Sequence, residues 1–477
     1  MQASFAAAPP IPPPAPTVVK ETLGTKLRRK AADASINNPL TATPWTAPVA
    51  WVASTAYVQG QLVTNNGNMY VCITSGTSAS SGGPTTTNGS AQSDGSAAWG
   101  FYSSATPASS DSNAPTLTLS SSTPSGLTNL YNPNTFPTFY TVRGGSATTY
   151  ATSYWQMIGF NRSANSPWSV GISIDMIIDA PKFAIGFTNG VSPVAVIING
   201  RYYSQGGIVQ TQSGTPNWAT FDFSSTLGKK RYKVTLQFYN SGQPTFAGVR
   251  VGPNDTMIPL PTSDIVNAVF ISDSIYAGSS YGPFIPGRTA PQRIAASLGW
   301  ENPTNMSQGG TGYINVGSGP YYNYPQRVAD TANAAQITNA NIIVLFGSTN
   351  DIGQSGIATA VTSTLSAIRS LNATAPIVVF GLWSINNAGV SATETAVQSG
   401  VTAFADPAAK TFFIPMYAAI PMPVVTGSWN NSANTGSTNS GLYINTGDNT
   451  HPEDIGTSYL GDWQADAILA QVLPYIQ

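Results

Sequence analysis

Charged side chains are scarce in this chain. Of its 477 residues only 8% are Asp, Glu, Lys or Arg, and the formal net charge is −1. The charged share is far below the roughly 25% usual in soluble domains, and Gly, Ser, Thr, Asn and Pro take its place. A surface this neutral gives no electrostatic reason to expect nucleic acid or an anionic membrane as a partner. The composition is typical of β-rich, loop-rich extracellular or virion proteins.

Cysteine, histidine and glutamate are also scarce. The single cysteine, Cys72, excludes an intrachain disulfide and a cysteine-based metal site. The single histidine, His451, makes a zinc or non-haem iron site hard to build, because such sites usually need two or three imidazoles. We therefore expect no metal and no cofactor. The few glutamates form no evident carboxylate pair of the glycosidase kind.

Long apolar runs are absent, and the first residues do not look like a leader. No stretch approaches the roughly 18 apolar residues of a membrane span. A basic n-region is missing and prolines follow at once, so we expect no signal peptide. Residues 1–44 are predicted to be an arm with a polyproline spacer at 9–16 and a helix at 18–34. The helix has a basic cluster (Lys26, Arg28, Arg29 and Lys30), and we interpret the arm as an attachment device for other virion proteins; a solvated helix face is the alternative.

Residues 45–104 are predicted to form a small β module. The β runs 57–63 and 68–73 are joined by the turn signal Asn65-Asn66-Gly67. The order of motifs resembles the short, aromatic-rich carbohydrate-binding modules of chitinases and phage tail proteins. That resemblance implies that aromatic side chains stack on sugars, although in so small a module they are equally expected to form the core. The candidates are Trp45, Trp51, Trp99 and Tyr102.

The rest of the chain is predicted to form two larger domains. Residues 115–262 alternate apolar and polar positions between Gly- and Pro-containing turns, which indicates a β-sandwich of the jelly-roll type, interpreted as a scaffold. In residues 263–477 buried β runs alternate with helical patterns, which indicates a three-layer α/β/α fold around a parallel sheet. The strands are expected at 266–271, 341–346, 377–382 and 411–417, and the helices at 288–299, 356–371, 391–405 and 453–474.

Polar stretches follow the strands of this last domain. Ser274 comes just after the first strand, where a helix start would place its hydroxyl beside free backbone N–H groups. A glycine-rich turn lies at 305–312, and Asn350 follows the strand at 341–346. His451 comes three residues after Asp448, so its Nδ1 can bind that carboxylate while Nε2 faces a nucleophile. Ligands of such sheets bind at the carboxyl ends of the strands, where these residues are expected.

These stretches, in this order, resemble the SGNH (GDSL-type) hydrolase family over roughly residues 264–477. The resemblance implies that Ser274 is the nucleophile, His451 the general base, and Asp448 the residue that orients the imidazole. It also implies an oxyanion hole made of the Ser274 N–H, the Gly310 N–H and the Asn350 side chain. No metal is required in that chemistry.

The chain departs from the family pattern at two places. Ser272 stands where the family usually has glycine, and 347–350 contains one residue more than the common Gly-x-Asn-Asp. The choice of Gly310 over Gly309 follows from the spacing within the second stretch alone. Asp273 and Asp351 are interpreted as residues that brace loops by hydrogen bonds.

A jelly roll followed by such a hydrolase is similar to carbohydrate esterases. We therefore expect a serine esterase that removes acyl groups, chiefly acetyl, from a bacterial surface polysaccharide. The composition favours a phage virion, as a tail or spike protein, and a homotrimer is one open possibility. The loop at 418–447, with Trp429 and Tyr443, is the predicted glycan wall. The alternatives are a secreted bacterial carbohydrate esterase or lipase and a non-catalytic, glycan-binding adhesin or virion fibre.

Overall fold

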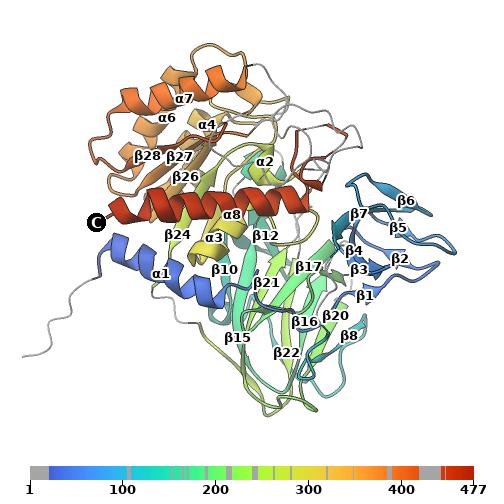
Figure 1. The fold of residues 1–477 in the computed structure, drawn as a ribbon. Helices are drawn as coiled ribbons and strands as arrows, with labels where there is room; N and C mark the ends of the chain where they lie inside the picture. The colour runs from blue at the N-terminus through green and yellow to red at the C-terminus, as the bar shows by residue number, and fades with distance from the viewer. Residues whose placement is uncertain are drawn as a thin grey trace, which may run out of the picture.

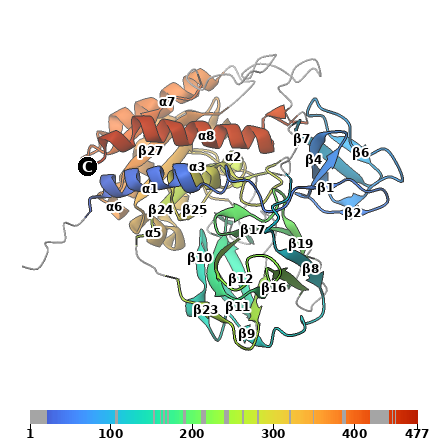
Figure 2. The ribbon, with the colours of Figure 1, turned by 60° about the horizontal axis from the view of Figure 1, so that its bottom comes forward.

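The computed structural model places a small β module, a β-sandwich and an α/β domain side by side (Figures 1 and 2). It describes residues 21–477 except 105–108, 152–153, 160, 164–165, 169–170, 189–191, 211–216, 239–244, 261–263, 280–281, 319–320, 348, 384–388, 418–441, 446 and 449. No helix in these described ranges is both long and apolar enough to cross a membrane.

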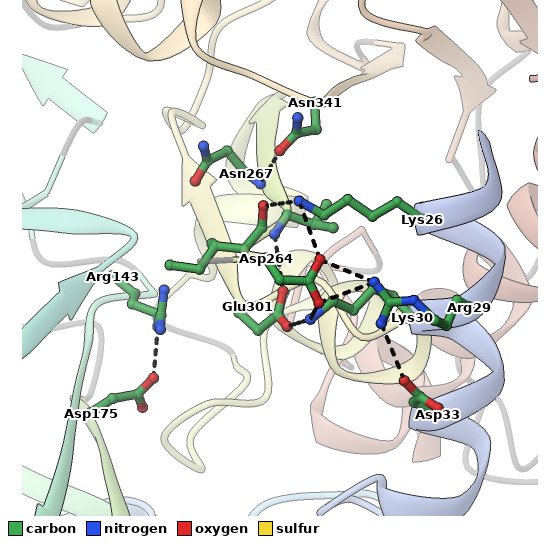
Figure 3. A network of polar contacts seen from close by, with 12 residues as sticks. Lys26, Arg29, Lys30, Asp33, Arg143, Asp175, Asp264, Asn267, Glu301 and Asn341 are labelled. Carbon is green, nitrogen blue, oxygen red and sulfur yellow. Dashed lines mark hydrogen bonds and ion pairs between the residues drawn. The ribbon is translucent and has the colours of Figure 1, made fainter. Parts of the chain in front are cut away.

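Helix α1 (Leu23–Asn37) packs onto the α/β domain (Figure 2). Its basic side chains bind that same domain. Lys26 donates to the Ile265 carbonyl (2.7 Å), and Lys26, Arg29 and Lys30 surround Asp264, as Figure 3 shows. The prediction that this helix belongs to a separate attachment arm is therefore wrong. The basic cluster serves internal packing, and the polyproline segment at 9–16 lies outside the described residues.

The buried side of α1 gives a stability prediction. Leu27 is 0% exposed, whereas Ile36 on the same helix is 81% exposed. Replacing Leu27 by alanine should lower the free energy of unfolding by about 2–5 kcal/mol, since it leaves a cavity in the core of the α/β domain. The control Ile36→Ala should change it by less than about 0.5 kcal/mol. Urea unfolding followed by tryptophan fluorescence measures both, and equal effects of the two changes would contradict this packing.

The small module has a sheet in the order β1-β3-β4-β7-β6, with β2 paired to β5. The predicted hairpin is confirmed: β3 and β4 are antiparallel, and Asn66 and Gly67 at their turn have φ of 48° and 78°. Both central residues of such a tight turn need positive φ, which Asn and Gly tolerate. The strands are β1 Val49–Ala50, β2 Ala56–Tyr57, β3 Leu62–Asn65, β4 Asn68–Thr74, β5 Gly76–Thr77, β6 Gln92–Asp94 and β7 Ala97–Ser103.

Trp99 and Trp45 are core side chains, and Trp51 packs partly buried against the core of the small module. Trp99 is 0% exposed and its Nε1 donates to Asp94 Oδ2 (2.9 Å), so no ring face is left for a sugar. Trp51 donates to the same oxygen (2.7 Å). Trp45 is buried in the sandwich, where its Nε1 donates to the Ile198 carbonyl (3.1 Å). The prediction that Trp99 binds substrate is therefore wrong, and Trp45 belongs to the neighbouring domain.

The region after the module is a β-sandwich, as predicted. One sheet has the order β10-β15-β21-β17-β18 and the other β11-β12-β22-β16-β20-β8. Alternate side chains of β15 and β16 face each other across one apolar core, which is the burial pattern of two packed sheets. The strands are β8 Thr116–Ser120, β9 Asn129–Tyr131, β10 Thr141–Arg143, β11 Gly145–Ala151, β12 Tyr154–Gly159, β13 Asn161–Ser163, β14 Ser166–Trp168, β15 Ser173–Asp179, β16 Lys182–Thr188, β17 Ser192–Ile198, β18 Arg201–Tyr202, β19 Ile208–Gln210, β20 Asn217–Asp222, β21 Arg231–Phe238, β22 Thr245–Val251 and β23 Thr256–Ile258.

The C-terminal domain is built on a parallel sheet in the order β25-β24-β26-β27-β28. Helices α1, α3 and α8 cover one face and α4 to α7 the other, so the central strands are buried on both sides and almost wholly apolar. The elements are β24 Asn267–Ile271, α2 Ser274–Ala277, α3 Ala290–Leu298, β25 Asn302–Asn305, α4 Tyr324–Ala329, α5 Thr331–Thr338, β26 Ile342–Gly347, α6 Ile357–Leu371, β27 Ile377–Leu382, α7 Val390–Phe404, β28 Thr411–Ile414 and α8 Asp454–Gln471. The predicted α/β fold is thus confirmed.

Candidate active site

Ser274 lies where the chain leaves β24 and enters the short helix α2. Asp273 caps this helix, and its Oδ1 accepts a hydrogen bond from the Ile275 N–H (2.9 Å). Burial raises the pKa of the Asp273 carboxyl to about 6, although that N–H bond and the nearby His451 lower it. The carboxylate is therefore a brace for the turn, and Ser274 stands at the carboxyl edge of the sheet.

His451 and Asp448 face Ser274 from the segment before α8. His451 Nε2 lies 2.7 Å from Ser274 Oγ, and Nδ1 is hydrogen-bonded to Asp448 Oδ2. The other carboxylate oxygen of Asp448 accepts from the backbone N–H groups of Thr450 (3.0 Å) and His451 (3.2 Å). The carboxylate thus fixes both the turn and the imidazole. The structure brings the predicted serine, histidine and aspartate together in one hydrogen-bonded chain.

The other predicted stretches lie beside Ser274. The Asn350 side chain donates to the Thr311 carbonyl (3.0 Å) and lies near Asp273 Oδ2 (3.5 Å). Of the two glycines, Gly309 is the one against Ser274: a Cβ placed on it would lie 3.6 Å from the Ser274 Cβ. Gly310 has φ of +73° and lies against the Gly317 Cα. The donor roles of Gly310 and Asn350 stay predictions.

Asp351 braces the same loop from behind. Its carboxylate accepts from the N–H groups of Tyr313 (2.6 Å), Ile314 (3.2 Å) and Asn315 (2.8 Å). A Cβ on Gly312 would lie only 2.3 Å from this carboxylate, so the loop needs glycine there. Burial raises the pKa of Asp351, while the three N–H bonds lower it. These contacts support the interpretation of Asp351 as a bracing residue.

Two further carboxylates hold loops at this edge and were not predicted from the sequence. Glu394 Oε2 accepts from the N–H groups of Leu382 (2.9 Å), Met416 (3.0 Å) and Tyr417 (2.9 Å). Asp454 accepts from the N–H groups of 284 (3.1 Å) and 285 (3.2 Å). In both cases one buried acid satisfies several backbone donors of a turn. Nothing in the local sequence distinguishes these acids from ordinary surface ones.

Among the predicted substrate-binding aromatics, Trp99 and Tyr102 have structural roles. The Tyr102 hydroxyl accepts from Arg288 Nη1 (2.7 Å), and the ring packs between the small module and residues 284 and 285. Tyr102 is therefore an interdomain contact, which corrects its predicted role. Tyr443 packs edge-on against Tyr459, with ring centroids 6.1 Å apart. Trp429 lies outside the described residues.

Glu453, two residues after His451, gives a pH prediction. Burial raises the pKa of its carboxyl to about 8, even though Asn445 donates to it (3.0 Å). The unfolded chain releases this proton near pH 4.5, so the group favours the folded state below that pH and loses this contribution as the pH rises toward 8. Glu453→Gln keeps an acceptor for Asn445 and cannot ionise.

Glu453→Gln should therefore raise the free energy of unfolding at pH 9 by on the order of 1–2 kcal/mol, a value reduced for the partial exposure of this side chain. At pH 4 the variant and the wild type should agree. Urea unfolding at the two pH values measures the difference. If the variant is only as stable as the wild type at pH 9, the pKa of Glu453 is not raised in the folded protein.

Among the described residues, no three or more His, Cys, Asp or Glu side chains are grouped so that they could hold a metal ion. The site can perform chemistry that needs a nucleophilic hydroxyl, a base and hydrogen-bond donors. Histidine accepts the serine proton in such arrangements, and the carboxylate fixes its tautomer.

No protein-family model and no curated protein matches the sequence. Several solved structures match the fold. An active-site mutant of a family two carbohydrate esterase from Clostridium thermocellum superposes with a TM-score of 0.51 at 14% identity, covering 70% of this chain and 98% of that one. A second structure of a family two carbohydrate esterase from Clostridium thermocellum, in complex with cellohexaose, superposes with a TM-score of 0.50 at 14% identity. The match covers 69% of this chain and 98% of that one. The salicylyl-acyltransferase SsfX3 from a tetracycline biosynthetic pathway superposes with a TM-score of 0.50 at 15% identity. The match covers 70% of this chain and 97% of that one. At these identities the likeness concerns the fold: the chain has the fold shared by these carbohydrate esterases and this acyltransferase.

Proposed function

We propose that this protein is a serine esterase that removes acyl groups, chiefly acetyl, from a bacterial surface polysaccharide. The hydrogen-bonded chain of Ser274, His451 and Asp448 carries the proposal. It stands at the carboxyl edge of a parallel sheet, where α/β proteins bind their ligands. The departures from the SGNH pattern at Ser272 and at 347–350 do not interrupt the hydrogen bonds between Ser274, His451 and Asp448.

The chemistry follows from the positions of the atoms. His451 Nε2 takes the proton of the Ser274 hydroxyl as its oxygen attacks the acyl carbonyl, and Asp448 stabilises the imidazolium that forms. The Ser274 N–H, the Gly310 N–H and the Asn350 amide are the proposed donors to the oxyanion. Each such donor is worth on the order of 3 kcal/mol in other enzymes. His451 then protonates the leaving alcohol, and water activated by the same base releases the acid.

The fold supports a carbohydrate as the substrate. The matching carbohydrate esterases are covered almost completely by this chain, and the matched share exceeds the α/β domain alone. The β-sandwich and the small module lie next to that domain (Figure 1). A polymer can therefore contact more of this protein than the catalytic edge. Family two carbohydrate esterases with this fold include one solved with cellohexaose.

The location on a phage virion is a proposal from composition and stands apart from the catalytic one. The low charge and the abundance of Gly, Ser, Thr and Asn favour it. There are two alternatives: a secreted esterase with the same site, and an adhesin without activity. Peptides of this chain in purified phage particles would support the virion location. Their absence from particles, with the protein found in bacterial culture medium, would favour the secreted alternative.

Transfer of the acyl group to another hydroxyl is a second candidate reaction, because an acyltransferase shares the fold. Acetate release from a panel of acetylated bacterial polysaccharides, followed by chromatography, separates the two reactions. Release from at least one polymer, lost in Ser274→Ala, supports the esterase. Transfer of acetyl to an added alcohol without free acetate would favour the acyltransferase, and neither product from any acyl ester would refute the proposed function.

A further inference from the structure

Arg327 of helix α4 is buried directly beside the glycine-rich loop. It is 1% exposed, and its guanidinium makes several short contacts. Nη1 donates to the Ser272 carbonyl (2.7 Å), and Nη2 donates to Thr311 Oγ1 (2.6 Å) and to the Tyr322 carbonyl (2.8 Å). Gln308 Oε1 lies 3.4 Å from Nη2. One planar group thus joins the end of β24 to the loop at 308–311.

The atoms to which Arg327 donates hydrogen bonds fix the position of the loop at 308–311 relative to Ser274. Ser272 lies two residues before Ser274, and its carbonyl also accepts from the Gln308 N–H (3.1 Å). The Thr311 hydroxyl donates to the Gln308 carbonyl (2.7 Å), which closes the loop across 309–310. Arg327 therefore fixes both ends of the glycine pair relative to the turn that carries Ser274.

The third predicted oxyanion donor is attached to the same loop. The Asn350 side chain donates one hydrogen bond to the Thr311 carbonyl (3.0 Å). Thr311 thus accepts a hydrogen bond from Arg327 at its hydroxyl oxygen and one from Asn350 at its carbonyl oxygen. A shift of Thr311 would move the glycine N–H groups and the Asn350 amide together.

The burial of this cation is costly for stability alone. Within the described residues Arg327 forms no ion pair with a carboxylate, and burial lowers the pKa of its guanidinium to about 10. Taking an ion out of water is costly unless its partners compensate, so apolar residues often replace buried ions without loss of stability. What arginine supplies here is a rigid fork that reaches several acceptors at once.

We infer that Arg327 is a positioning residue, which holds the glycine loop and Asn350 at the places where they meet the oxyanion that forms on the acyl carbonyl oxygen when Ser274 attacks. This inference rests on the proposed function. Arg327 touches no reacting atom in this account. Its effect falls on the transition states and the tetrahedral intermediates of the reaction, because the oxyanion is absent from the bound substrate.

The test compares Arg327→Met and Arg327→Lys with the control Arg369→Met, using an aryl acetate as substrate. Arg369 is buried in the same domain and binds Asp406 (2.7 Å) and the carbonyls of 372 and 375, away from Ser274. For Arg327→Met kcat should fall roughly 100-fold, about the effect of losing one oxyanion donor, with KM within about twofold and an unchanged pH profile. Arg327→Lys keeps the charge and part of the contacts, so its loss should be smaller. Arg369→Met should unfold more easily and keep its kcat per folded molecule.

Amide hydrogen exchange gives a readout that needs no substrate. Exchange at 308–312 should become faster in Arg327→Met and stay unchanged in Arg369→Met, measured well below the unfolding temperature. If Arg327→Met only lowers stability, with normal kcat per folded molecule and normal exchange at 308–312, the inference is wrong. If the wild type shows no turnover that depends on Ser274, the proposed function fails and the role toward the oxyanion fails with it. Faster exchange at 308–312 would then show only that Arg327 holds the loop in place, and unchanged exchange would refute that as well.

Discussion

Replacing Ser274 by alanine should lower kcat/KM for acetyl esters by on the order of 10⁵-fold, the scale of nucleophile removal in serine hydrolases. The reason is that the Ser274 hydroxyl is the proposed nucleophile, and its oxygen lies 2.7 Å from Nε2 of His451, the proposed base. The residual rate would come from the oxyanion donors and from substrate binding. Initial rates of acetate release measure the loss.

Ser297→Ala is the matched control for this change. Ser297 lies on α3 and its hydroxyl contacts Asn38 (3.4 Å), so its loss should leave turnover within about twofold. The folded fraction of both variants should equal that of the wild type. A Ser274→Ala protein that retains more than about a tenth of the activity would exclude Ser274 as the nucleophile.

Replacing His451 by alanine should reduce turnover on a similar scale, about 10⁵-fold, because the proposed mechanism uses the same imidazole for acylation and for release of the acyl group. The chain contains one histidine, so no second imidazole can substitute. The side chain is partly exposed, which lets a small base enter the space it leaves. Added imidazole should therefore restore part of the activity of His451→Ala.

The same addition should leave Ser274→Ala inactive, since that variant lacks the nucleophile and keeps the base. Steady-state rates of both variants at rising imidazole concentration make the comparison. Near-wild-type turnover of His451→Ala without imidazole would show that another group acts as the base. Equal rescue of both variants would mean that imidazole itself hydrolyses the substrate.

The α/β domain was predictable because each of its main strands is buried on both faces. Residues 342–347 and 377–382 are continuous apolar runs, which sequence alone identifies. The edge strand β25, Asn302–Asn305, was missed because it has only polar residues and a proline, which edge positions tolerate. Helices α4 and α5 were missed as well, since each is short.

The predicted serine, histidine and aspartate could be identified from the sequence because their residue types and spacing fit few other roles. The lone histidine, three positions after an aspartate, indicated a hydrolase only together with the serine at a strand end, the glycine-rich turn and Asn350, in the order of the SGNH pattern. The aromatics were ambiguous by nature: Trp99 has the same sequence signal as a sugar platform or as a core side chain, and only burial decides. The basic residues of α1 were equally ambiguous, because their acidic partner Asp264 lies far away in the chain.

Residues that act at a distance along the chain gave no local signal. Arg327 contacts the turn before Ser274 and the loop at 308–311 only after the chain has folded. Asp454 and Glu394 likewise bind N–H groups of loops remote in sequence. Their roles depend on tertiary hydrogen bonds, and such bonds leave no periodicity or motif in the sequence.

The central claim is that the Ser274 hydroxyl attacks the acyl carbon. Mass spectrometry of protein quenched during turnover of an activated acetyl ester tests it most directly, because it identifies the residue that carries the acetyl group. The expected result is one acetyl group on the peptide that contains Ser274, absent from Ser274→Ala. Turnover with the acetyl group on another residue, or equal acetylation of Ser274→Ala, would contradict the account.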